Sequence, residues 1–150
     1  MLTVEIRPFT EDDAVPASRI IQTCYTTLNL GDYAPDGIRS QLLDNSPEKL
    51  VESSRTTRLF VAVTDGEVVG IGGYNPERIR TVFVAPAFHR RGIGSLIVSH
   101  ALNDARQHGI KHLESWSTPL AEDFYQNLGF KKIEILDYGT IKFVRMSIDL

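Results

Sequence analysis

Cysteine is nearly absent from this sequence, since Cys24 is the only one among 150 residues. A single thiol excludes an internal disulfide and a multi-cysteine metal site. Long apolar runs are missing too, because no stretch approaches the ~20 residues of a membrane-spanning helix. The opening MLTVEIRPFTEDD carries acids where a secretory signal would carry a basic start. We therefore expect a cytoplasmic protein.

An excess of basic residues is also lacking: 16 Lys and Arg face 19 Asp and Glu, for a net charge of −3. Neither a nucleic acid nor a membrane surface is therefore an expected partner, although a local basic cluster could still bind one anion. Hydrophobic residues make up 42% and charged residues 23%, as in ordinary soluble proteins. The length predicts a single domain over residues 1–150 that is large enough to bury its own core.

Periodicity predicts a mixture of strands and helices. Apolar and alternating patterns predict strands over residues 2–7, 59–64, 67–74, 78–84, 110–116, 132–137 and 140–148. Helices are predicted after Thr10, over residues 36–53 with a break at Ser46-Pro47, over 92–108, and from Pro119 to Gly129. The element order predicts one α/β or α+β domain with a mixed sheet.

Two glycine clusters are candidates for ligand binding. The first, at residues 70–75, contains G-x-G but lies within a predicted strand that no helix follows. A dinucleotide fingerprint needs a strand, a glycine turn and then a helix. We therefore interpret these glycines as sites of a bulge or of close backbone approach in the sheet.

The second cluster, HRRGIGS at residues 89–95, lies between a strand and the most regular predicted helix. The start of a helix leaves backbone N–H groups unpaired and carries partial positive charge, so it suits a phosphate. Glycines remove obstructing Cβ atoms, and Arg90 and Arg91 add positive charge. The alternatives are an ordinary helix start with solvated arginines, or a nucleotide-binding protein that uses the same amides.

The wider sequence resembles the GNAT N-acetyltransferase superfamily. FVAPAFHRRGIGSLI is similar to its acetyl-CoA signature, and TPLAEDFYQNLGF to its second signature, A-x-x-F-Y-x-x-x-G-F. The hairpin VAVTDGEVVGIGG and the opening IRPFTEDD are similar to that family as well. The resemblance implies a mixed, mostly antiparallel sheet with helices on both faces and a cleft between two splayed parallel strands.

The resemblance also implies positions in the site. The backbone of Phe83 and Val84 would pair with the pantetheine arm of acetyl-CoA, and Tyr125 would give a proton to the departing thiolate. The alternative for Tyr125 is a purely structural role, as a core aromatic beside Phe124. The cofactor-binding set is completed by His89, Arg90, Arg91, Gly92, Ile93, Gly94, Ser95 and Thr118. No metal is implied.

Three positions depart from the family pattern. His89 stands where Arg or Gln is usual, Thr118 where many relatives carry Asn, and Arg78 where some place a glutamate base. An amine nucleophile must lose a proton, because its pKa is near 10.4. Glu77 and Glu114 are candidate bases, but a solvated or ion-paired carboxylate is the first interpretation of each, and neither is assigned as the base.

Aromatic residues are the candidates for the acceptor pocket. Tyr25, Tyr33 and Trp116 would border it if the first helices cover it as in relatives, with plain core as the alternative for Trp116. Cys24 is interpreted as a small buried hydrophobe, and His100, His108 and His112 lack the arrangement of a metal site.

The sequence therefore predicts an acyltransferase that moves an acetyl group from acetyl-CoA to a primary amine of a small molecule or peptide. A non-catalytic acyl-CoA-binding module on the same fold is the alternative. The net acidity favours a cationic amine, and a homodimer is possible by analogy with the family.

Overall fold

The computed structural model describes residues 3–27, 35–139 and 141–150. Its strands form two antiparallel sheets. The four-stranded sheet has the order β1 (Glu5–Pro8), β2 (Arg58–Thr64), β3 (Glu67–Tyr74) and β4 (Ile79–Val84). The three-stranded sheet has the order β5 (His112–Ser117), β7 (Lys142–Asp149) and β6 (Lys131–Asp137).

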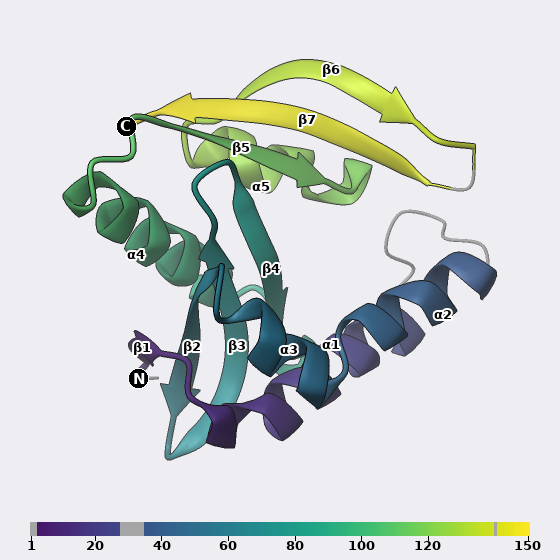
Figure 1. Ribbon diagram of the computed structural model, residues 1–150, viewed down its shortest axis with the longest axis vertical. Helices are drawn as coiled ribbons and strands as arrows, with labels where there is room; N and C mark the ends of the chain where they lie inside the picture. The colour runs from purple at the N-terminus through teal and green to yellow at the C-terminus, as the bar shows by residue number, and fades with distance from the viewer. Residues whose placement is uncertain (1–2, 28–34, 140) are drawn as a thin grey trace.

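The two sheets meet between the parallel strands β4 and β5. An isolated parallel bridge joins Arg78 to Glu114, and the Glu114 N–H donates to the Glu77 carbonyl at 3.0 Å. Beyond this bridge the strands diverge, and Figure 1 shows β5, β6 and β7 lying across one end of the four-stranded sheet. The expected mixed, mostly antiparallel sheet with splayed parallel strands is confirmed.

Helices cover both faces of the four-stranded sheet. On one face, α1 (Ala14–Thr27) and α3 (Pro47–Ser53) pack through Ile21 and Leu50 onto β2 and β3, and α2 (Pro35–Asp44) adjoins them. On the other face, α4 (Ile93–Gln107) packs through Ile97 and Val98. α5 (Glu122–Asn127) packs against the three-stranded sheet (Figure 1). Short 3₁₀ turns, η1 (Glu11–Asp13), η2 (Pro86–Phe88) and η3 (Pro119–Ala121), precede α1, α4 and α5. No helix in the described ranges is long and apolar enough to cross a membrane.

Local sequence signals explain several boundaries. Ser46 caps α3 by accepting the Lys49 N–H at 3.3 Å, and Pro47 occupies the first helical position, so the predicted helix over 36–53 divides in two. Asp65 and Gly66 take the positive φ values of +50° and +75° that the predicted hairpin turn requires. Thr118 lies at the predicted cap position, but its side chain makes no capping hydrogen bond.

The glycines of β3 allow α4 to lie close to the sheet. A Cβ on Gly70 would lie 2.8 Å from Ile97 Cδ1, and one on Gly72 would lie 2.6 Å from Ile97 Cγ2. The interpretation of this cluster as a site of close approach, rather than a dinucleotide fingerprint, is confirmed.

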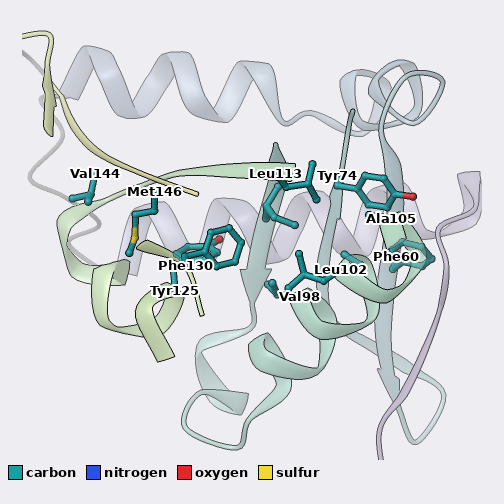
Figure 2. Packing of buried hydrophobic residues seen from close by; sticks show 12 residues of the cluster. Phe60, Tyr74, Val98, Leu102, Ala105, Leu113, Tyr125, Phe130, Val144 and Met146 are labelled. Atoms are coloured by element: carbon teal, nitrogen blue, oxygen red, sulfur yellow. The ribbon is translucent and has the colours of Figure 1, made fainter. Parts of the chain in front are cut away.

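One core joins the two sheets. Figure 2 shows Phe60 and Tyr74 of the four-stranded sheet in the same cluster as Val98 and Leu102 of α4 and Leu113 of β5. The cluster continues to Tyr125, Phe130, Val144 and Met146. The splay between β4 and β5 therefore opens within a packed molecule.

Candidate active site

A groove of about 1150 Å³ follows the splay between β4 and β5. It is lined on the α4 side by Val84, Gly92, Gly94, Ser95, Phe124 and Tyr125, and on the α1 side by Tyr25, Arg78, Arg80, Phe83 and Trp116. A single cavity therefore reaches both faces of the sheet.

The start of α4 presents unpaired backbone donors to the groove. Gly92 precedes the helix with φ +77°, a conformation that L side chains rarely adopt, and no side chain caps the helix. The first helical bond runs from the Leu96 N–H to the Gly92 carbonyl at 3.1 Å. The N–H groups of Ile93, Gly94 and Ser95 thus have no carbonyl in their own helix to pair with. This turn therefore has the free donors that the predicted anion cradle requires, and anion binding there stays a prediction.

The two arginines of the cradle segment lie differently. Arg90 lines the groove, with a backbone φ of +63°. The Arg91 guanidinium instead lies over the Phe88 ring at 5.3 Å, and Arg91 is not among the lining residues. The structure therefore brings Arg90 to the groove and places Arg91 beside it.

Strand β4 contributes its free edge. The Ala85 N–H donates to the Val69 carbonyl on β3 at 2.9 Å, and antiparallel pairs alternate between mutually bonded and non-bonded positions. The Phe83 backbone is therefore directed to its β3 partner Ile71, and the Val84 N–H and carbonyl are directed away from β3, toward the splay. Of the two predicted backbone contacts, Val84 has the polar groups that β3 leaves unpaired, and Phe83 instead contributes its ring, 5.5 Å from that of Tyr25.

The Val84 carbonyl already has partners. His89 Nε2 lies 2.7 Å from it, and the Cys24 thiol donates to it at 3.3 Å. The His89 ring is thus held against the strand end instead of extending toward a phosphate. Burial raises the pKa of Cys24 to about 11, which keeps the thiol protonated and agrees with its interpretation as a small buried side chain.

Tyr125 lies at the α5 wall of the groove, only 7% exposed. Its ring contacts Phe124 and Phe130 edge-on, with centroids 5.0 and 5.3 Å away. Burial raises the pKa of Tyr125 to about 12, and a hydrogen bond with the Ser115 side chain acts in the opposite direction. The phenol therefore stays protonated around neutral pH and has a proton to donate.

Sequence reasoning missed a second hydroxyl in the groove. Ser117 is 7% exposed, and within the described ranges its Oγ is the one buried side-chain oxygen or nitrogen that has no hydrogen-bond partner. Leu113, Ser115 and Ser117 alternate along β5 and share its buried side. That alternation is the signal that could have found it.

The acceptor-side candidates have mixed outcomes. Tyr25 and Trp116 line the groove, whereas Tyr33 lies outside the described residues. Trp116 Nε1 donates to Glu114 Oε1 at 2.8 Å, so this side chain is part of a polar assembly.

Neither candidate base is well placed for proton abstraction. Arg145 binds Glu114 through two hydrogen bonds, at 2.9 and 2.7 Å, and this contact, followed by Trp116, lowers the pKa of Glu114 to about 2. A carboxylate of that pKa accepts protons poorly near neutrality. Glu77 is exposed and is not among the residues of the groove.

Comparisons with known proteins agree with this geometry. Residues 29–150 match the model of the acetyltransferase (GNAT) domain family. The chain is 30% identical over 89 residues to an uncharacterized N-acetyltransferase of Methanocaldococcus jannaschii, a match that covers 57% of this chain and spans only 39% of that relative. It is 31% identical over 112 residues to the peptidyl-lysine N-acetyltransferase YjaB of Salmonella typhimurium, covering 72% and 73% of the two chains.

A solved structure gives the same result for the fold. The PaiA N-acetyltransferase of Thermoplasma acidophilum, crystallised with coenzyme A, superposes with a TM-score of 0.83 at 20% identity and covers 99% of both chains. The same fold therefore exists in a protein that binds coenzyme A.

Proposed function

This chain belongs to the GNAT acetyltransferase family, and we propose that it transfers the acetyl group of acetyl-CoA to a primary amine of a small molecule or peptide. The observation that carries this proposal is one continuous groove with an uncapped helix start and a buried tyrosine hydroxyl at its α4 side. The likeness to a peptidyl-lysine N-acetyltransferase adds lysine side chains to the candidate acceptors.

Main-chain donors would hold the coenzyme. The amides of Ile93, Gly94 and Ser95 offer several aligned hydrogen bonds to a pyrophosphate, together with the positive end of the α4 dipole. The free Val84 N–H lies at the splay, where it would pair with the extended pantetheine arm or polarise the thioester carbonyl. Thr118 and Ser117 line the same stretch of the groove.

The transfer itself needs one bond made and one broken. The unprotonated amine nitrogen bonds to the acyl carbon of the thioester, the carbon–sulfur bond breaks, and the electron pair leaves on sulfur. Tyr125 would donate its proton to that thiolate, the excess proton of the amine would pass to water, and a proton from water would then restore the Tyr125 phenol. Water takes this role in the proposal because Glu114 is paired with Arg145.

Two glycine variants at opposite ends of α4 test the coenzyme cradle. Gly92 and Gly109 both have left-handed φ values, of +77° and +80°, and a Cβ at either would meet no atom within 4 Å. Gly92→Glu and Gly109→Glu should therefore lose similar amounts of stability. We expect only Gly92→Glu to abolish acetyl-CoA binding in a calorimetric titration, because it places a carboxylate at the cradle.

A thiol-release assay with acetyl-CoA over an amine library tests the transfer. Release that depends on an added amine supports the proposal. Tight acetyl-CoA binding by the Gly92→Glu variant would count against the cradle, and acetyl-CoA binding without release for any amine would favour the non-catalytic module.

A further inference from the structure

Arg78 and Arg80 lie on the α1 side of the groove. Ile79 packs into the core beneath α4, so its two neighbours along the strand are directed to the opposite face. A bulge at Thr81, whose φ is +62°, then shifts the alternation by one residue, and Phe83 rejoins the arginines on the α1 side. Both arginines line the groove.

Contacts on the open face of the three-stranded sheet fix the position of Arg78. Its guanidinium lies over the Trp116 ring, 4.2 Å from the centroid. Glu114 holds the Trp116 indole, and Arg145 holds Glu114 in turn. The ring covers one face of the guanidinium, and the N–H groups at its edge point outward in its own plane.

Arg78 and Arg80 have no carboxylate partner within the described ranges. Glu114, which holds the nearby Trp116 indole, is already paired with Arg145, and Asp44 of α2 lines the groove without an ion pair to either arginine. Partial desolvation and the charge of Arg78 lower the pKa of Arg80. Two positive charges therefore lie close together and uncompensated, an arrangement that an anionic ligand would stabilise.

Apolar rings line the rest of this side. Phe143 of β7 and Tyr138 meet edge-on at 6.2 Å, and both line the groove with Trp116. Phe83 and Tyr25 close the wall toward α1. A ligand with one anionic group and an apolar body would match both features.

We propose that the acceptor is a small amine that also carries a carboxylate, which Arg78 and Arg80 bind while its apolar body lies against Trp116 and Phe143. This inference rests on the proposed function, because the bound molecule is an acceptor only if the protein transfers an acetyl group to it. It reverses the expectation from net charge, because the charge lining the acceptor side is positive although the chain carries −3 overall. An arginine fork suits a planar carboxylate, which it can bind through two parallel hydrogen bonds.

The test uses matched amines that differ only in the carboxylate. L-Phenylalanine, its amide and 2-phenylethylamine are compared by thiol release with acetyl-CoA, and by calorimetric binding to the protein saturated with coenzyme A. Leucine and serine, each with its amide, extend the panel to aliphatic and polar bodies. The variants are Arg78→Ala, Arg80→Ala and the charge-preserving Arg78→Lys, with the exposed Arg55→Ala as a control outside the groove.

We expect the acid of each pair to be the better acceptor. Arg78→Ala and Arg80→Ala should each raise its KM about tenfold or more, the range of a hydrogen bond to a charged group. Their KM for acetyl-CoA should stay within about threefold, Arg78→Lys should lose less than Arg78→Ala, and Arg55→Ala should change neither KM.

The remaining outcomes bear on the carboxylate inference and on the acetyl transfer separately. Equal use of acids and amides, or equal losses for both in the arginine variants, would overturn the carboxylate inference and leave the acetyltransferase intact. Arginine-dependent binding of the acids without thiol release would support the carboxylate site and contradict the transfer. Failure of every acid to bind would overturn the inference.

Discussion

Tyr125 has a raised pKa, which both favours and opposes its role as a catalytic acid. Its burial among Phe124 and Phe130 raises the pKa to about 12, so the proton is always present but is hard to release. A thiolate, whose conjugate acid has a pKa near 8.5, accepts that proton only uphill. Ser115 reduces the mismatch, because its hydrogen bond stabilises the phenolate.

Replacement of Tyr125 by Phe removes the donor and keeps the ring contacts. Because general acid catalysis contributes about a hundredfold or more, we expect kcat to fall by at least about tenfold while the KM for acetyl-CoA changes little. Steady-state rates with a saturating amine measure both constants. A variant with normal kcat would reduce Tyr125 to a packing side chain.

Ser115→Ala should act on the same proton indirectly. Loss of the hydrogen bond raises the pKa of Tyr125 further, so the phenol stays protonated and kcat falls less than in Tyr125→Phe. Since the pKa is already about 12, deprotonation of Tyr125 should cause no alkaline loss of kcat between about pH 7 and 10 in either protein. A drop in that range that disappears in Tyr125→Phe would contradict the raised pKa.

At the scale of an element, the glycines of β3 allow α4 and β2 to approach this strand more closely than a side chain would permit. Gly70 and Gly72 receive Ile97 of α4 on one side, and a Cβ on Gly73 would overlap the Arg58 carbonyl oxygen of β2. The Ile97 Cδ1 atom next to Gly70 is a flexible chain end that can move, whereas the Arg58 oxygen belongs to a paired strand.

Gly73→Ala should therefore be far more damaging than alanine at another glycine of the same hairpin. We expect a loss of at least about 3 kcal/mol in the free energy of unfolding, because the strands must separate locally. Gly66→Ala meets no atom within 4 Å and has only the strain of φ +75°, about 1–2 kcal/mol. Urea unfolding of both variants measures the difference, and equal losses would contradict the overlap.

Single elements also show how far the sequence could lead. The stripe of Ile93, Ile97 and Val98 predicted α4, because a helix repeats its buried side every three to four residues. The bulge at Thr81 left no comparable signal, and an uninterrupted strand over 78–84 would have placed Phe83 opposite Arg78 and Arg80. The contact of the His89 ring with the Val84 carbonyl depends on tertiary neighbours, so no local pattern could have predicted it.

At the scale of the whole molecule, the splay leaves part of a strand edge unpaired inside a packed fold. The Val84 N–H faces it, whereas the adjacent Ala85 N–H is bonded to Val69. The sequence motifs around residues 89–95 and Tyr125 predicted the place of the groove, because both adjoin it. The width and lining of the groove come from the divergence of two sheets that share one core, which no motif encodes.

Amide hydrogen exchange should detect the bound coenzyme at the N–H groups that line the splay. We expect acetyl-CoA to slow exchange at Val84 and at Gly94 and Ser95, because each would gain an acceptor. Ala85 serves as the internal control, since its bond to Val69 exists without ligand. Protection of α1 and β7 without protection of Val84 would place the coenzyme elsewhere.

The same splay gives the groove walls from opposite faces of the sheet, with α4 and α5 on one side and α1 and β7 on the other. Donor and acceptor would approach from opposite sides and meet within the thickness of the sheet. Because each would use its own side, steric access would dictate no order of addition, and both reactants could be present before any bond changes.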